Sequence, residues 1–321
     1  MHKYRDSLPQ LNGKLFLTDG GLETTLVFHE GIELPNFAAF DLLRTVDGER
    51  RLRAYYRQYA NIAIANKLGF VLESATWRAS SDWGKLMGYS DVALDAINRQ
   101  SVEMLASLRD ELETSDSPMV ISGCIGPRGD GYSPASFMTA TEAREYHSRQ
   151  IRSFASSVAD MVTAMTITYA EEAIGIVQAA SSENIPSAIS FTVETDGKLP
   201  SGQSLQDAIE QVDAETDSAV VYYMINCAHP EHFENILSGN DAWLNRIRGI
   251  RANASSKSHA ELDESETLDD GNPEELGHAY RCFRKNLKQL NVVGGCCGTD
   301  TRHIEAICKS TMGVQSVSAD A

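Results

Sequence analysis

The segment Asn291-Val292-Val293-Gly294-Gly295-Cys296-Cys297-Gly298-Thr299 joins a short apolar run to a glycine-rich cysteine pair. Adjacent cysteines do not readily bridge each other, because a disulfide requires a particular separation and dihedral angle. Both can, however, face one metal ion. A third cysteine, Cys227, ends another apolar run in Asn226-Cys227. Three thiolates match a catalytic zinc site, in which three protein ligands leave the fourth tetrahedral position open.

The other three cysteines, Cys124, Cys282 and Cys308, each lie singly in ordinary segments. Free cysteine is among the most buried residue types, so we interpret these three as core filling. The glycines around the cysteine pair differ from this pattern. They remove side chains beside the sulfurs, which favours the close approach of a ligand or an unusual backbone conformation.

Apolar runs typical of strands alternate with longer helical patterns along the chain. Thr139 and Glu142 form a capping box at one helix start, and Asn272-Pro273 opens another helix. Gly69 is predicted to end the helix over 51–68 in a left-handed conformation. Eight runs are predicted to be strands: 15–19, 70–76, 119–123, 161–166, 187–192, 220–227, 247–251 and 291–295.

Eight strands that alternate with helices predict an α/β fold, a single (β/α)8 barrel over residues 1–321. A doubly wound open sheet is the alternative. The barrel is favoured because the glycine-rich and cysteine motifs all follow predicted strands, at the face where barrel enzymes carry their active sites. Strands six and eight converge at a barrel mouth, so their cysteines can share a metal. The acidic segment 253–271 is predicted to be a solvated excursion rather than a lid, and the tail after residue 312 is predicted to fray.

Composition limits the function further. The chain has 321 residues, 42% of them hydrophobic, and a formal charge of −17, which argues against nucleic acid as a partner. The polar N-terminus and the absence of a long apolar run predict a cytoplasmic protein that does not enter membranes. Thiols stay reduced in that compartment, which favours a metal site over disulfides. The sequence does not indicate an oligomeric state.

Five motifs follow one another along the chain: Asp19-Gly20-Gly21, Ser122-Gly123-Cys124-Ile125-Gly126-Pro127, Ser190-Phe191-Thr192, Asn226-Cys227 and Gly294 to Thr299. With these motifs in this order, the chain resembles the zinc-dependent homocysteine S-methyltransferases over nearly its full length. The Asn-Cys and Gly-Gly-Cys-Cys-Gly-Thr motifs are the specific ones.

The resemblance implies a (β/α)8 barrel that binds Zn²⁺ through Cys227, Cys296 and Cys297. It implies further that Asp19 holds the ammonium group of the acceptor, while the backbone N–H groups of Gly20 and Gly21 hold its carboxylate. The alternative role for Asp19 is to cap the following helix.

Other residues are candidates by their position. Asn226 either orients a cysteine ligand or touches the metal, and a purely structural hydrogen bond is the alternative. Thr76 is a candidate contact of the acceptor at the end of strand two. Trp77 and Trp83 are candidates for an aromatic wall beside a cationic methyl donor, and packing is the alternative for at least one of them.

The sequence departs from the family pattern at two places. A Glu-Thr-Ile-Pro-like motif usually ends strand four, whereas this chain reads Met165-Thr166-Ile167-Thr168. Ser74-Ala75-Thr76-Trp77 stands where Thr-Asn-Thr-Tyr is usual. Met165 cannot pair with an ammonium group, so a related thiol or a differently anchored homocysteine stays open as the acceptor.

We therefore predict an S-methyltransferase that binds a small-molecule methyl donor and a thiol acceptor. Zinc deprotonates a coordinated thiol, whose ordinary pKa is near 8.5, and three cysteine thiolates keep such a sulfur electron-rich. The expected donor is an onium compound, namely S-methylmethionine, S-adenosylmethionine or betaine. The expected reaction is the methylation of homocysteine, which forms methionine. The alternatives are a phosphate-binding barrel enzyme, since barrels often bind phosphate near strand eight, and a non-catalytic zinc or thiol sensor.

Overall fold

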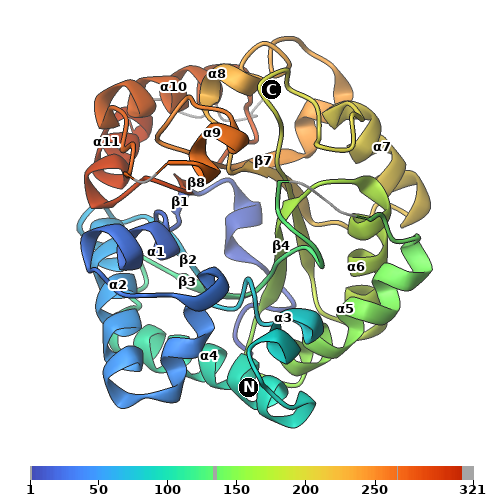
Figure 1. Cartoon of the computed structure of the whole chain (residues 1–321). Coiled ribbons are helices and arrows are strands. Elements are labelled where there is room, and N and C mark those ends of the chain that lie inside the picture. The colour runs from blue at the N-terminus through green and yellow to red at the C-terminus, as the bar shows by residue number, and fades with distance from the viewer. Residues whose placement is uncertain (1, 133–135, 266, 313–321) are drawn as a thin grey trace.

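The computed structural model describes residues 2–132, 136–265 and 267–312. Eight parallel strands pair in sequence order and close into a barrel, which confirms the predicted (β/α)8 fold. Figure 1 shows the helices arranged as a ring around the barrel. The strands are β1 (Phe16–Leu17), β2 (Gly69–Glu73), β3 (Met119–Ile125), β4 (Met161–Ile167), β5 (Ser187–Phe191), β6 (Tyr222–Asn226), β7 (Ile247–Ala252) and β8 (Val292–Gly295).

Helices follow each strand, although several are short. No helix in the described ranges combines the length and the apolar composition needed to cross a membrane. The α-helices are α1 (Leu22–Thr24), α2 (Val46–Ala65), α3 (Ser81–Leu86), α4 (Asp91–Leu112), α5 (Ala140–Ala155), α6 (Ala170–Ser182), α7 (Leu205–Glu215), α8 (Pro230–Phe233), α9 (His259–Asp263), α10 (Pro273–Asn286) and α11 (Thr301–Met312). A π-helix, η2 (Thr25–His29), and the 3₁₀ segments η1 (Pro9–Asn12), η3 (Pro35–Phe37), η4 (Ala39–Arg44) and η5 (Ala242–Arg246) complete the set.

The helix signals in the sequence were mostly reliable. Thr139 and Glu142 form the predicted capping box of α5, and Asn272 caps α10 with Pro273 in the first turn. The prediction for Gly69 was wrong. Gly69 begins β2, and the left-handed residue after α2 is Lys67, with a φ of 55°. Glycine is needed at position 69 because a β-carbon there would collide with the Phe16 ring.

Two apolar cores stabilise the barrel. The larger one packs the outer faces of the strands against the helices. The smaller one fills the barrel interior with Phe16, Val71, Val120, Met161 and Tyr222 among others, and Leu8 from the N-terminal segment joins it. The strands also carry buried polar side chains. These are, among others, Glu73, Ser122, Thr163, Asn226 and Arg251.

The acidic segment does not match its prediction as a solvated excursion. It contains α9, and Ser255, Leu262, Leu268 and Asp269 line the cavity at the barrel mouth. His259 of the same segment is only 5% exposed. Composition gave no indication of this role, because a few apolar and polar side chains attach the segment while carboxylates such as Glu261 and Glu264 stay exposed. The tail predicted to fray after residue 312 lies outside the described residues.

Candidate functional site

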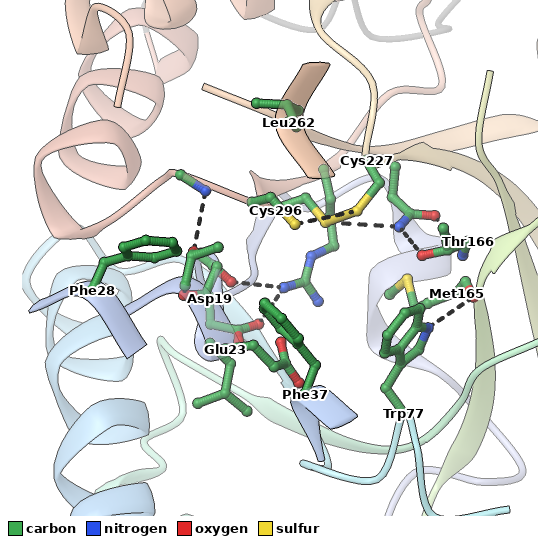
Figure 2. A pocket seen from close by; sticks show the side chains of 18 of the residues that line it. Asp19, Glu23, Phe28, Phe37, Trp77, Met165, Thr166, Cys227, Leu262 and Cys296 are labelled. Carbon is green, nitrogen blue, oxygen red and sulfur yellow. Dashed lines mark hydrogen bonds and ion pairs between the residues drawn. A yellow bond between two sulfur atoms is a disulfide. The ribbon is translucent and has the colours of Figure 1, made fainter. Parts of the chain in front are cut away.

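A cavity of about 440 Å³ opens at the C-terminal ends of the strands. In the view of Figure 2, Asp19 and Glu23 lie together on one side, and Trp77 and Met165 lie on the other. The residues singled out from the sequence that line this cavity are Asp19, Gly20, Gly21, Trp77, Met165, Asn226, Cys227, Cys296 and Cys297. Thr76 and Trp83 do not line it.

The three predicted metal ligands meet at the cavity wall. The sulfur atoms of Cys227, which follows β6, and of Cys296 and Cys297, which follow β8, all lie within 4.8 Å of one another. Among the residues that the structure describes, no other three His, Cys, Asp or Glu side chains bring ligand atoms this close. Cys227 and Cys296 are joined as a disulfide. The site therefore needs reduction before all three sulfurs are available as thiolates.

The donor set fits zinc. Tetrahedral zinc with Zn–S bonds of about 2.3 Å places its sulfur ligands about 3.8 Å apart. The sulfurs of Cys227 and Cys297 are 3.8 Å apart. Three soft sulfur donors from two strand ends, with cavity space beside them, match a thiolate zinc site with one open position.

The backbone around Cys227 is held in a conformation that non-glycine residues rarely adopt, with a φ of 55°. Such a conformation persists only where its surroundings fix it. The Cys227 N–H donates to the carbonyl of Arg251 at 3.2 Å. Its own carbonyl oxygen accepts from His259 Nε2 at 2.6 Å and from the Thr192 hydroxyl at 3.4 Å. These contacts orient the sulfur.

The glycines beside the cysteine pair match the prediction only in part, since Gly298 alone adopts an unusual backbone conformation. A β-carbon at Gly294 would collide with the Thr18 hydroxyl, and one at Gly295 would collide with Thr299. Gly298 alone needs a left-handed conformation, with a φ of 79°. Gly294 therefore allows the β8 end to pack closely against the β1 end, and Gly295 allows Thr299 of the following loop to pack against β8, rather than clearing space around the sulfurs.

Asn226 connects the ends of three strands. Its Oδ1 accepts from the Thr166 N–H at 2.9 Å and from the Ser190 hydroxyl at 2.6 Å. Its Nδ2 donates to the Thr166 hydroxyl at 2.8 Å and lies 3.8 Å from the Cys296 sulfur. A polar hydrogen toward the sulfur favours the thiolate form and orients it.

Tyr132 is a site residue that the sequence did not reveal. Its hydroxyl lies 3.5 Å from the Cys227 sulfur and 3.7 Å from the Cys297 sulfur. Its ring stacks on His259 with a centroid separation of 4.1 Å. His259 Nδ1 lies 3.2 Å from Glu194 Oε1, so both of its ring nitrogens face oxygen acceptors. The only sequence signal was the position of Tyr132 in the loop after strand three.

Asp19 lies where predicted but already has a cationic partner. Arg251 Nη2 contacts Asp19 Oδ1 at 2.8 Å, and the Tyr55 hydroxyl donates to Oδ2 at 3.0 Å. Burial alone would lower the pKa of Arg251, but the charges of Asp19 and Glu73 outweigh it and raise that pKa. Gly21 precedes α1 as its N-cap residue, so Asp19 does not cap that helix.

The glycines after Asp19 are constrained by packing. The Gly21 N–H donates to the Thr299 carbonyl at 3.0 Å, so it is not available to an acceptor carboxylate as the resemblance implied. A β-carbon on Gly20 would lie 2.8 Å from the same carbonyl oxygen and 2.9 Å from the Tyr59 hydroxyl. Both glycines thus bring the β1 end close to the loop after β8.

Two residues assigned to ligands are placed elsewhere. Thr76 is fully buried, and its hydroxyl donates to the Cys124 carbonyl at 2.7 Å, so it does not face the acceptor. The guanidinium carbon of Arg78 lies 4.0 Å from the Trp77 ring centroid and 3.9 Å from that of Trp83. Trp83 thus stacks on a cation of the protein, outside the cavity, whereas Trp77 also lines the cavity and donates to the Met165 carbonyl at 3.2 Å.

Two carboxylates in the cavity were not identified from the sequence. Glu23 in α1 and Glu73 in β2 both line it, and burial raises the pKa of each to about 7. Glu73 is 5% exposed. A charged residue inside the predicted strand 70–76 was the available signal, because buried charges are rare unless they have a function or a partner.

Three cysteines that converge at the catalytic face of a barrel form a possible metal site. The homocysteine S-methyltransferase family model matches residues 16–311. The chain belongs to this family and is a methyltransferase.

Relatives and solved structures agree with this placement. Homocysteine S-methyltransferase 1 of Brassica oleracea var. italica is 24% identical over 92% of this chain and 93% of its own length. Selenocysteine Se-methyltransferase of the same plant is 24% identical over 95% of this chain and 91% of its own length. The metallated form of the homocysteine methyltransferase MmuM from Escherichia coli shares the fold, with a TM-score of 0.70 and 16% identity over 92% and 96% of the two chains.

Proposed function

We propose that this enzyme transfers a methyl group from an onium donor to the sulfur of homocysteine, forming methionine, and that it uses Zn²⁺ to do so. The observation that carries the proposal is the group of three cysteine sulfurs within 4.8 Å of one another at the barrel mouth. The names of the plant relatives support a thiol or selenol acceptor.

Cys227, Cys296 and Cys297 would hold the metal after reduction of the disulfide. When bound, zinc supplies deprotonation of a coordinated thiol at neutral pH. The protein side chains maintain the thiolates: Asn226 donates toward Cys296, and the Tyr132 hydroxyl lies beside the other two sulfurs. Asn226 therefore acts as a positioning residue in this proposal.

Methyl transfer forms one sulfur–carbon bond on the acceptor while the donor's bond from its onium sulfur or nitrogen to the same carbon breaks. The electron pair of that bond returns to the onium atom, which leaves neutral. Water competes poorly where the reacting atoms are enclosed, and Leu262 and Leu268 of the acidic segment line the cavity above the strand ends.

The cavity suits a cationic donor. The aromatic rings of Phe28, Phe37, Trp77 and Tyr132 line it, and aromatic faces attract onium groups by about 0.5 to 2 kcal/mol each. Trp77 remains the proposed donor contact. The carboxylate of Asp269 also lines the cavity and adds attraction for a cation. These features apply to S-methylmethionine, S-adenosylmethionine and betaine alike.

The phosphate-binding alternative has little support. Phosphate sites use free backbone N–H groups, whereas the Gly295 and Cys296 N–H groups donate to the carbonyls of Asp19 and Ala252 at 3.0 and 2.9 Å. The Gly298 N–H donates to the Thr24 hydroxyl at 3.1 Å. The glycine-rich end of β8 thus has few donors left for an anion.

A screen of the reduced, zinc-loaded enzyme against the three donors and a set of thiol acceptors tests the proposal. We expect methionine to form from homocysteine with one donor preferred over the others. Tight zinc binding without transfer from any donor to any thiol would instead identify a zinc or thiol sensor.

A further inference from the structure

Glu73 places a carboxylate in the cavity that the protein itself does not fully neutralise. Its side chain comes from the end of β2, lines the cavity and is 5% exposed. The hydroxyls of Ser122 and Thr163 interact with the carboxylate, but both are neutral groups. Its Oε2 atom has no hydrogen-bond partner within the described parts of the chain. A buried carboxylate with an unpaired oxygen atom favours a cationic partner.

The two cations near the cavity are already engaged. Arg251 contacts Asp19 through Nη2 and donates to the Gly295 carbonyl through Nε at 3.0 Å. Arg78 is stacked against two tryptophan rings and donates to the Gly129 carbonyl at 3.1 Å. Arg251 forms its ion pair with Asp19, so Glu73 has no direct ion pair of its own among the described residues. Burial accordingly raises its pKa, although the charge of Arg251 opposes this effect.

The strand β4 does not supply an anion at this end of the barrel. Met165 lines the cavity there and packs in the barrel interior with Trp77. Thr163, two residues earlier in the same strand, interacts with Glu73. Glu73 therefore lies one interior layer deeper than Met165, on the opposite side of β3, and opens to the same cavity.

We propose that Glu73 binds the ammonium group of the acceptor, so that the preferred acceptor is a thiol amino acid held from β2. The proposal rests on the thiol methyltransferase activity proposed above. It differs from the contact expected for Asp19, whose carboxylate is paired with Arg251. An ammonium at Glu73 would supply the positive charge and the hydrogen-bond donors that this carboxylate lacks.

The variant Glu73→Gln tests this assignment, because glutamine keeps the shape and removes the charge. The probes are homocysteine and 4-mercaptobutanoate, which has the same thiol and carboxylate but no ammonium group. We expect kcat/KM for homocysteine to fall roughly 10- to 100-fold, as for loss of one charge-assisted hydrogen bond. The value for 4-mercaptobutanoate should change less than about threefold, since a merely structural defect would lower both alike.

The control variant is Glu23→Gln, which removes another cavity carboxylate whose pKa burial raises to about 7. It should keep the preference for homocysteine. The proposal would be overturned if Glu73→Gln kept the wild-type preference for homocysteine over 4-mercaptobutanoate. It would also be overturned if only Glu23→Gln lost that preference. Zinc content is measured in every variant, so that loss of metal is not mistaken for loss of acceptor binding.

Binding measurements separate this inference from the proposed function. We expect calorimetry on the wild-type protein to show at least tenfold tighter binding of L-methionine than of 4-(methylthio)butanoate, its analogue without the ammonium group. Equal affinities would overturn the proposal without any variant. A further outcome separates the two proposals. If the enzyme methylates no thiol, but wild type binds L-methionine more tightly than 4-(methylthio)butanoate and Glu73→Gln does not, the proposed function fails while the ammonium site stands.

Discussion

The substitution Glu73→Gln should change how protein stability depends on pH. Burial raises the pKa of Glu73 from its ordinary value of 4.5 to about 7 in the folded protein. The folded state thus binds a proton more tightly than the unfolded state does. The stability associated with this proton is fully present below pH 4.5 and is lost as the pH rises through about 7.

The size of the effect follows from linkage. A rise in pKa of this size corresponds to roughly 3 kcal/mol, of which about 2 to 3 kcal/mol falls between pH 5 and pH 8. Glutamine does not titrate, so Glu73→Gln does not lose this stability as the pH rises. The free energy of unfolding of Glu73→Gln minus that of wild type should therefore be larger at pH 8 than at pH 5 by about 2 to 3 kcal/mol. Groups common to both proteins, such as Glu23, cancel in the comparison.

Urea unfolding of reduced, metal-free wild type and Glu73→Gln at pH 5 and pH 8 measures this difference. Metal is removed because zinc affinity itself depends on pH. The exposed residue Glu103 on α4 provides the control, and Glu103→Gln should show no pH-dependent difference from wild type. A difference for Glu73→Gln below about 0.5 kcal/mol between the two pH values would refute the claim that Glu73 is buried without a full counter-charge.

Three further variants test the site. Asp19→Asn removes the direct ion-pair partner of the buried Arg251 guanidinium, so we expect a loss of roughly 3 to 5 kcal/mol in urea unfolding, and a loss below about 1 kcal/mol would contradict the pairing. Met165→Glu should raise the ratio of kcat/KM for homocysteine over 2-mercaptoethanol, and an unchanged ratio in a folded variant would place Met165 away from the ammonium. His259→Ala removes the hydrogen bond to the Cys227 carbonyl, so zinc should pass to a chromogenic chelator faster than in wild type. The exposed control His278→Ala should release zinc at the wild-type rate, and equal rates in the two variants would exclude a positioning role for His259.

The barrel and the cysteine site could be predicted because both depend on local patterns. Each strand is a short apolar run, and the run at 291–295 ends directly in the cysteine pair. A barrel brings the ends of all strands to one face, so Cys227 could be assigned to the same site without knowing any distance. The capping box at Thr139 is equally local.

The charge pairing could not be predicted because it joins residues far apart in sequence. Asp19 follows β1 and Arg251 lies in β7, and no pattern around either residue indicates the other. The position of Thr76 depended on side-chain direction just beyond β2, where one residue decides whether a group faces the cavity. Trp83 lies in α3 and stacks on Arg78, a contact that no local pattern indicates. Gly69 showed the same limit, since its packing partner is the Phe16 ring in a neighbouring strand.

Metal analysis of the reduced protein, combined with methyl-transfer assays, tests the central claim most directly. We expect about one zinc per chain, and we expect Cys227→Ala, Cys296→Ala and Cys297→Ala each to lose both tight zinc binding and transfer, because two thiolates cannot replace a three-ligand site. Cys124→Ala and Cys282→Ala should keep their zinc. Full transfer activity in any of the first three variants, or a reduced wild-type protein that binds no zinc, would contradict the proposed metal centre.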